Sequence, residues 1–320
     1  MKGDRFQNPW PQDKHGFLDI LRWKLGLPPH ESPRIPDAPD NPASSVPLSR
    51  QKIAQPPKLG WRVVWLGHAS FLLQGAGVSI LIDPMFSPHC APIKLPSFRR
   101  LAAPPCTLED LPPIHAVLLT HSHYDHLDLP TLRRLGNRIP LIVPEGHASW
   151  LKRAGFSQSM EVSWFTSHTL APGVTVTATP AQHFTARSPW NHNRGHWCGW
   201  LLEGAGCSLL HTGDSGYCDG FREIGARFGP IDFGMIPIGA YQPRHIMRSM
   251  HMNPEEAAQA FLDTRCQRAV AMHWGTFRLT DEPAGEPPLL LARALEQFQI
   301  APQNFITGAI GQSWDITPTS

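Results

Sequence analysis

Three histidines and an aspartate lie within six positions of the chain, directly after an apolar stretch. They form the pattern His-x-His-x-Asp-His at residues 121–126. Imidazole and carboxylate groups are ligands that suit zinc, and iron or manganese can replace it. Because side chains alternate along an extended strand, we expect His121 and His123 to project to the same side. Asp125 and His126 follow the strand, where a loop can turn them toward a second ion about 3.5–4 Å from the first.

A histidine-rich surface loop and a structural zinc site are the other interpretations of this pattern. A structural zinc site normally draws on closely spaced cysteine pairs. The chain has six cysteines, which are scattered and also lack the spacing of a disulfide framework. They are Cys90, Cys106, Cys198, Cys207, Cys218 and Cys266. We therefore expect reduced, buried thiols and a catalytic metal site.

The pattern resembles the metal-binding motif of the metallo-β-lactamase superfamily. Members of that superfamily take further ligands from a later histidine, a bridging aspartate and a last histidine, each at a strand end. Residues of these types follow apolar, β-prone segments here in the same order: His183, Asp214 and His273. We assign one ion to His121, His123 and His183, a second ion to Asp125, His126 and His273, and the bridge to Asp214. A hydroxide between the ions is the expected nucleophile, because coordination lowers the pKa of water to about 7.

Groups that orient the ligands are the next requirement of such a site. Each ligating imidazole needs a partner for its other ring nitrogen. Asp83 ends a neighbouring predicted strand, so we expect it to accept a hydrogen bond from a ligand. A turn residue before Pro84 is the alternative. We assign His68 the same supporting role.

The length and charge of the chain favour a single folded unit that does not bind nucleic acid. The chain has 320 residues, with 28 basic and 26 acidic side chains, so it fits one αββα unit and carries no basic footprint for nucleic acid. No apolar leader opens the sequence, and no stretch approaches the ~18–20 apolar residues of a transmembrane helix. We expect a cytoplasmic protein; peripheral contact with a membrane surface and a homodimer remain open.

The first part of the chain differs in composition from the rest. Residues 1–58 are rich in proline and polar residues, which predicts an extended arm, and residues 59–320 are predicted to form the catalytic domain. The arm contains a short amphipathic segment at residues 17–27. We expect it to form a helix that packs on the body. A contact with a membrane surface through the flanking cations is the alternative.

The body alternates between predicted strands and helices that position these residues. The predicted strands cover residues 62–66, 69–74, 78–82, 116–119, 140–143, 173–179, 198–203, 207–211, 233–238 and 269–272. Helices are predicted after Asp128, over 221–228, from Asn253 and over 287–299, and Asn253 with Glu256 forms a capping box. Two β-rich halves, each followed by helices, imply an α+β fold in which two sheets pack face to face, the four-layer αββα sandwich of the metallo-β-lactamase fold.

A closer resemblance covers nearly the whole chain. The sequence is similar to the family of N-acylphosphatidylethanolamine-hydrolysing phospholipases D and their bacterial relatives. The matching segments are residues 6–11, 65–70, 83–87, 214–217, 223–230, 236–241 and 273–277. The resemblance implies a phosphodiesterase with two Zn²⁺ ions that cleaves a phospholipid between phosphate and head group. Its products would be phosphatidic acid and an N-acylethanolamine.

The segment 244–252 mixes cations with methionines, which adapt to irregular apolar ligands. We expect Arg244 and Arg248 to bind phosphate oxygens. We expect His251 to contact the substrate or protonate the leaving group, and Tyr241 to line the same site. A solvated loop is the alternative.

Two departures from the family pattern fall near the expected substrate groove. Met250 stands where the animal members carry glutamine, and residues 184–196 differ among relatives. Both bear on head-group and acyl preference, so a lactonase acting on a sugar-phosphate or acyl lactone is the alternative function. Di-iron oxygen reductases of this fold usually carry glutamate at the position of His123. A non-catalytic binding module would be expected to lose ligands, and this chain keeps them.

Overall fold

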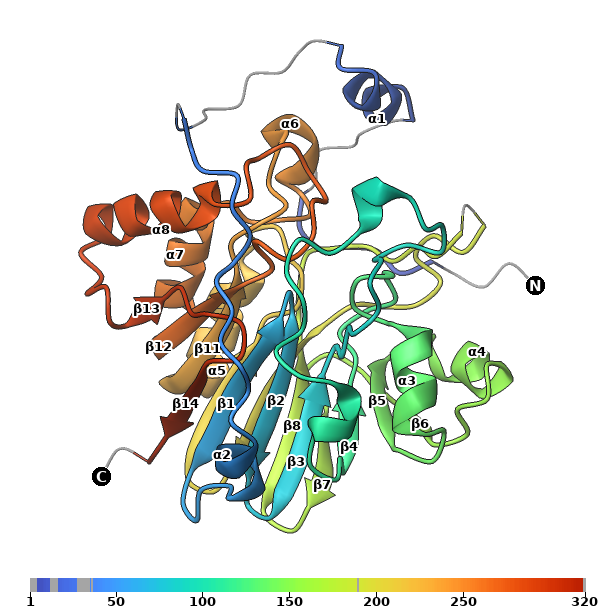
Figure 1. The fold of residues 1–320 in the computed structure, drawn as a ribbon, viewed down its shortest axis with the longest axis vertical. Coiled ribbons are helices and arrows are strands. Elements are labelled where there is room, and N and C mark those ends of the chain that lie inside the picture. The colour runs from blue at the N-terminus through green and yellow to red at the C-terminus, as the bar shows by residue number, and fades with distance from the viewer. Residues whose placement is uncertain (1–4, 12–16, 28–34, 36, 189, 319–320) are drawn as a thin grey trace.

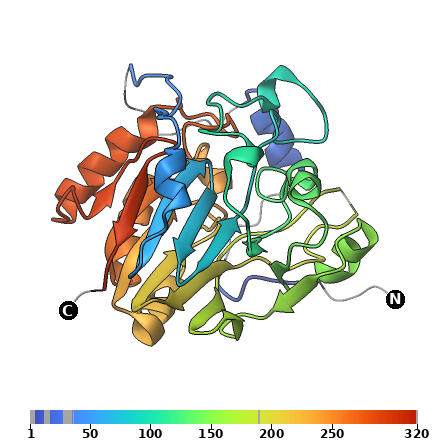
Figure 2. The same ribbon diagram turned by 60° about the horizontal axis from the view of Figure 1, so that its bottom comes forward.

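Two sheets packed face to face form the body of the molecule, with helices on both outer faces (Figure 1 and Figure 2). The computed structural model describes residues 5–11, 17–27, 35, 37–188 and 190–318. Each sheet contains seven strands. This arrangement is the four-layer α+β sandwich expected from the sequence, and the predicted fold class is confirmed.

The first sheet has the strand order β14-β1-β2-β3-β4-β5-β6. Its strands are β1 (Trp61–Gly67), β2 (Ser70–Gly75), β3 (Val78–Ile82), β4 (Ala116–Leu118), β5 (Leu141–Pro144), β6 (Ser159–Val162) and β14 (Ser313–Ile316). β1 to β3 are antiparallel, and β3 to β6 are parallel. Side chains of β1 point alternately to the two faces of the sheet. Val63 and Trp65 pack in the core between the sheets, and Val64 and Leu66 pack in a second core on the opposite face. The whole strand is therefore buried.

The second sheet has the strand order β13-β12-β11-β10-β9-β8-β7. Its strands are β7 (Ser167–Ala171), β8 (Val174–Thr179), β9 (Gly199–Gly204), β10 (Cys207–His211), β11 (Ile231–Pro237), β12 (Cys266–Met272) and β13 (Phe305–Ile306). β7 to β10 are antiparallel, and β10 to β13 are parallel. β8, β10 and β12 therefore run in the same direction, and the residues that follow them meet at one edge of the sheet.

Helices complete the two outer layers (Figure 1). The helices are α1 (Phe17–Lys24), α2 (Arg50–Ala54), α3 (Leu129–Leu135), α4 (Ala148–Arg153), α5 (Gly220–Phe228), α6 (Arg244–Met247), α7 (Pro254–Asp263), α8 (Glu286–Gln297) and the 3-10 turns η1 (Pro96–Phe98) and η2 (Leu108–Asp110). Leu132 of α3 and Leu151 of α4 belong to the core of the first sheet's outer face. α7 begins with the expected capping box, since Asn253 Oδ1 accepts from the amide of Glu256 at 2.8 Å and Glu256 Oε2 accepts from the amide of Asn253 at 3.2 Å.

The strands that the sequence pattern does not predict lie at the edges of the sheets. β6 and β14 flank the first sheet, and β7 and β13 flank the second. β6, β7 and β14 are each only partly buried. Edge strands with exposed side chains lack the apolar run that marks a central strand, so their sequences give a weak signal.

Residues 37–54 of the arm lie against the body. The amide of Ala43 donates to the carbonyl of Gly275 at 2.9 Å, and the amide of Val46 donates to the carbonyl of Ile310 at 2.8 Å. Ala43 and Ile53 are buried. Residues 37–54 therefore pack as part of the same structural unit as the catalytic domain.

α1 lies apart from the two sheets, beyond α6 in Figure 1. Trp23 Nε1 donates to Asp281 Oδ2 at 2.7 Å. The sequence predicts that the apolar residues of segment 17–27 pack on the body, but Leu18 is 69% exposed and Leu25, just after the helix, is 63% exposed. The prediction is wrong for these leucines, because the helix meets the body through Trp23. Among the described residues, no helix is long and apolar enough to cross a membrane.

Candidate metal centre

The side chains expected to bind metal lie on loops at one end of the two sheets. β4 ends at Leu118, earlier than expected, and the chain then turns through residues 121–126. His183, Asp214 and His273 follow β8, β10 and β12, whose carboxyl ends meet at one edge. All seven predicted ligands come together in this place: His121, His123, Asp125, His126, His183, Asp214 and His273.

Three imidazoles form the first group of donor atoms. His123 Nδ1 lies 2.8 Å from His121 Nε2 and 3.2 Å from His183 Nε2. The other nitrogen of His183, Nδ1, donates to the carbonyl of Met250 at 2.9 Å. This bond fixes the tautomer, because it leaves the lone pair on the Nε2 atom that faces the group. The three nitrogens can hold one ion.

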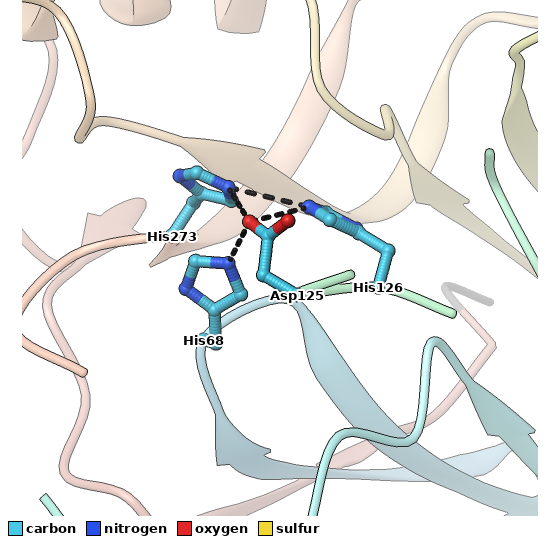
Figure 3. A group of neighbouring side chains, drawn as sticks. All are labelled: His68, Asp125, His126 and His273. Atoms are coloured by element: carbon cyan, nitrogen blue, oxygen red, sulfur yellow. Dashed lines mark hydrogen bonds and ion pairs between the residues drawn. The ribbon is translucent and has the colours of Figure 1, made fainter. Parts of the chain in front are cut away.

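A carboxylate and three imidazoles form the second group (Figure 3). Asp125 Oδ2 points between the rings and lies 3.5 Å from His126 Nε2 and 3.6 Å from His273 Nε2. The two Nε2 atoms are 3.3 Å apart. His68 Nε2 lies 2.9 Å from the same carboxylate oxygen, so His68 contacts one of the predicted ligands as expected.

Asp214 lies between the two groups. Its Oδ2 atom is 3.0 Å from both His126 Nε2 and His273 Nε2. The same oxygen is 4.0 Å from His121 Nε2 and 3.9 Å from His183 Nε2. A carboxylate in this position can share its two oxygens and its single negative charge between two cations.

The backbone around the second group is strained. His68, Asp83 and His273 have φ values of 54°, 42° and 62°, in the left-handed region that non-glycine residues rarely adopt. The amide of His68 donates to Thr276 Oγ1 at 2.8 Å, and its carbonyl accepts from the amide of His273 at 3.1 Å. Such strain costs about 1–3 kcal/mol per residue and persists only where surrounding bonds enforce it. The hydrogen bonds between the two loops supply that constraint.

Asp83 orients one of the imidazoles. It is fully buried at the end of β3 and accepts from His126 Nδ1 at 2.7 Å. It also accepts from the amide of Thr120 at 2.8 Å and from the hydroxyl of Thr120 at 2.5 Å. The carboxylate therefore directs His126 Nε2 toward the second group, in addition to forming the turn before Pro84.

The charges of the cluster shift its pKa values in opposite directions. Burial opposes a charge on His273, but Asp214 and Asp125 outweigh it and raise the pKa of His273 to about 9. Burial by itself would raise the pKa of Asp214, but the neighbouring His126 and His273 hold this pKa well below its usual range. Burial dominates at His123 and lowers its pKa to about 3. The carboxylates thus concentrate protons at the second group, where a cation could replace them.

Several buried polar atoms of this cluster lack a hydrogen-bond partner. They include Asp214 Oδ1, His251 Nδ1 and His273 Nδ1. Buried polar groups nearly always find a partner in proteins. His251 Nδ1 lies 4.0 Å from Asp214 Oδ2, so two of these groups are adjacent. Imidazole and carboxylate donors of this number fit divalent zinc, iron or manganese, and the cluster is able to bind metal.

A cavity of about 700 Å³ opens onto both groups. Its wall includes the metal-facing residues His123, Asp125, His183 and Asp214, together with His251. The apolar part of the wall consists of Trp23, Phe184, Ala240, Ile246, Met247, Met250 and Leu279. Among the described residues, none of the side chains lining it is a lysine or arginine.

Known proteins resemble this chain in sequence and in fold. Residues 79–274 match the family described as the beta-lactamase superfamily domain. The chain belongs to this superfamily. The resemblance to the metallo-β-lactamase superfamily is confirmed, and the protein is a metal-dependent hydrolase of the metallo-β-lactamase fold.

Named relatives within the superfamily differ in how specifically they are described. N-acyl-phosphatidylethanolamine-hydrolyzing phospholipase D 1 of Caenorhabditis elegans is 34% identical, over 80% of this chain and 76% of that protein. A UPF0173 metal-dependent hydrolase of Thermococcus kodakarensis is 29% identical, over 68% of this chain and 85% of that protein. The fold is similar to that of Igni18, a metallo hydrolase of Ignicoccus hospitalis, with a TM-score of 0.61 and 24% identity over 79% of this chain and 97% of that chain.

The sequence predicts that Tyr241 lines the substrate cavity, but the structure places it elsewhere. Its side chain is 1% exposed, and its hydroxyl donates to Glu286 Oε1 at 2.6 Å. Burial and the adjacent carboxylate raise the pKa of Tyr241 above its usual range. The expected substrate contact is corrected: Tyr241 anchors the loop after β11 to α8, while its neighbour Ala240 reaches the cavity.

The two arginines expected to bind phosphate also lie outside the cavity wall. Arg244 pairs with Glu256 at 2.7 Å and donates to the carbonyl of His251 at 2.9 Å. The side chain of Arg248 is 70% exposed, with Nε 3.5 Å from Glu256. Arg244 of α6 and Arg248 directly after it therefore face Glu256 of α7, while Met247 lines the cavity. Of the expected substrate contacts, His251 is the one that reaches it.

Arg187 is a residue that the sequence reasoning missed. Its guanidinium lies 3.9 Å from the centre of the Tyr124 ring, and Nη1 donates to the carbonyls of Ser122 at 2.9 Å and Leu127 at 2.8 Å. It thus holds both ends of the loop that carries the His-x-His-x-Asp-His motif. A single arginine in a polar stretch gives no signal for such a role, because the carbonyls it binds have no sequence signature.

Proposed function

We propose that this superfamily member is a binuclear zinc phosphodiesterase of the phospholipase D type. Its substrates would be phospholipids of the N-acylphosphatidylethanolamine class, cleaved between phosphate and head group. The observation that carries the proposal is the largely apolar cavity of about 700 Å³ that opens directly onto both groups of metal donors. The Caenorhabditis elegans relative, which is named for this activity, supports the same substrate class.

The apolar wall suits the acyl chains of such a substrate. Met247, Met250, Trp23 and Leu279 all contribute to this wall. Burial of apolar surface stabilises a bound lipid by roughly 25 cal/mol per Å². Methionine is flexible and polarisable, and it can follow an irregular chain. The wall therefore contributes binding energy without fixing one acyl length.

The polar end of the cavity would perform the chemistry. His121, His123 and His183 would hold one ion, Asp125, His126 and His273 the other, and Asp214 both. Bound divalent ions lower the pKa of a coordinated water to near 7 and offset negative charge on a phosphoryl oxygen. Asp83 keeps the Nε2 atom of His126 available as a ligand by accepting from Nδ1. His251 Nδ1 is unpartnered and faces the same space, where it can donate to a substrate or leaving-group oxygen.

A lactonase is the second candidate function. The observation that favours it is the lack of any lysine or arginine among the described residues of the cavity wall. A phosphodiester would have its charge balanced by the metal ions alone, whereas a neutral lactone needs no such balance. The same donor groups would then act on a carbonyl carbon.

Hydrolysis assays on the zinc-loaded protein test the proposal. An N-acylated phosphatidylethanolamine in mixed micelles would be compared with an acyl lactone and a chromogenic β-lactam, and zinc would be counted on the same sample. We expect phosphatidic acid and an N-acylethanolamine to appear only when metal is bound. If the lactone is hydrolysed and the lipid is not, the enzyme acts on acyl bonds, and the phospholipase proposal is refuted.

We also propose that the mouth of the cavity rests on a lipid surface. Leu18 of α1 and Leu25, directly after this helix, are largely exposed, and Ile93 and Leu95 before η1 are 60% and 48% exposed. Trp23 of the same helix lines the cavity. Sedimentation with phosphatidylethanolamine vesicles should pull down the protein, and Leu18→Glu with Leu25→Glu should release it. Equal sedimentation of the double variant would contradict this contact.

A further inference from the structure

The beginning of the arm lies across the loop that carries His183. The amide of Phe6 donates to the carbonyl of Asn193 at 2.9 Å, and the Phe6 ring meets the His196 ring edge-on at 4.5 Å. Trp10 stacks on Trp164 at 5.9 Å. Residues 5–11 are therefore held on both sides of Asn8 by aromatic contacts with the body.

Asn8 contacts the backbone of a predicted metal ligand. Its Nδ2 donates to the carbonyl of His183 at 2.7 Å, and its Oδ1 accepts from the amide of His183 at 3.2 Å. An asparagine amide offers a donor and an acceptor side by side, so one side chain can satisfy both polar groups of one residue. The two residues are 175 positions apart in the sequence, and Asn8 also lines the cavity.

His183 is thus constrained at two points. Asn8 fixes its backbone, and the carbonyl of Met250 fixes its ring through Nδ1. The remaining nitrogen, Nε2, lies 3.2 Å from His123 Nδ1 and 3.9 Å from Asp214 Oδ2. Loss of the backbone constraint would leave the ring tethered at one end, and metal sites tolerate displacements of only about 0.5 Å.

We propose that Asn8 is a positioning residue for the first metal ion and that residues 5–11 are a structural part of the metal centre. The inference rests on the two-metal centre of the proposed function, but it is independent of the substrate. It also gives the arm a defined role, because the arm completes the support of His183 that otherwise comes from the loop of Met250.

A chelator titration of the zinc-loaded full chain tests this inference. The test variant is Asn8→Ala, and the matched control is Gln7→Ala, since Gln7 is an exposed neighbour on the same arm. His183→Ala and His273→Ala identify which ion leaves first. Zinc retained per chain is counted at each chelator concentration, so the readout does not depend on catalysis.

We expect Asn8→Ala to release the ion that His183→Ala also loses, at a 10–100-fold lower chelator concentration than the control. The ion lost from His273→Ala should leave at an unchanged concentration. Asn8→Asp keeps the acceptor for the amide of His183 but sets a carboxylate oxygen against its carbonyl, so it should release this ion earlier than the Gln7→Ala control does. It also replaces the alanine variant if that variant does not fold.

Two results would overturn the inference. Titration curves of Asn8→Ala and Gln7→Ala that coincide would show that Asn8 does not support the site. Equal weakening of both ions would assign Asn8 a general structural role. If the Gln7→Ala control binds only one zinc, the two-metal centre of the proposed function is refuted instead. Failure of the proposed function can thus be distinguished from failure of the inference about Asn8.

Discussion

Asp83 offers the sharpest test of how the metal centre is organised, because its two oxygens have different partners. Oδ1 accepts from the amide of Thr120, while Oδ2 accepts from the hydroxyl of Thr120 and from His126 Nδ1. Asp83→Asn keeps the shape but turns one acceptor into a donor. If the amide nitrogen faces His126, the ring must carry its proton on Nε2, the atom that faces Asp214. If it faces the Thr120 amide, two donors oppose each other in a buried site.

The expected magnitudes follow from these bonds. Each hydrogen bond to a charged group contributes about 1.5–3 kcal/mol, so the loss of one should lower the free energy of unfolding of the metal-free protein by about that amount. Mutation of a group that orients a ligand typically costs 10–100-fold in metal affinity. That factor corresponds to about 1.4–2.7 kcal/mol of binding free energy. The effect should fall on the ion bound by His126, because Asp83 touches that ligand.

Denaturant unfolding of the metal-free protein and a chelator titration of the zinc form measure the two effects separately. Asp128→Asn is the matched control, since Asp128 is also buried and accepts from the amide of Ser87 at 3.0 Å and the hydroxyl of Thr131 at 2.5 Å. We expect the control to lose stability but to keep its zinc. Wild-type zinc affinity in Asp83→Asn, or an equal loss in the control, would refute the reasoning.

Three further predictions concern the same centre. Asp214→Asn should remove most hydrolytic activity and lower the zinc content, because the shared charge is lost; near-normal turnover with two ions bound would contradict the ligand assignment. Arg187→Ala removes two hydrogen bonds from a charged group, so it should cost about 3–6 kcal/mol of stability and speed amide hydrogen exchange of residues 122–127; unchanged exchange there would contradict its role. Because the pKa of His273 is about 9 in the metal-free site, zinc must displace a proton below that pH. Zinc affinity should therefore rise with pH up to about 9, and calorimetry in two buffers of different ionisation enthalpy should detect proton release.

The ligand positions were accessible from the sequence because two simple rules act on them. A strand of apolar residues places whatever follows it at the edge of a sheet, and imidazoles and carboxylates at such an edge attract metal ions. The rule holds even though β4 ends at Leu118, before the motif begins. His183, Asp214 and His273 obey it too, although they come from three separate strands.

The substrate contacts were not accessible in the same way. Whether a cation faces a cavity depends on its local partner, and Glu256 draws Arg244 away from the cavity. Tyr241 is buried because Glu286 of α8 accepts from its hydroxyl. Asn8 contacts His183 across 175 positions of the sequence. Pairings over such sequence separations leave no periodic pattern, so composition and spacing do not predict them.

The return of the last strand to the first sheet has a consequence during synthesis. β14 pairs with β1, and Arg62 of β1 forms an ion pair with Asp315 of β14 at 2.7 Å. One side of β1 therefore stays without a partner until residues 313–316 have left the ribosome. An apolar strand with an open edge is a template for association with other chains. We infer that the sheet closes only after residues 313–316 have been synthesised, and that nascent chains halted before β14 depend on chaperones to remain monomeric.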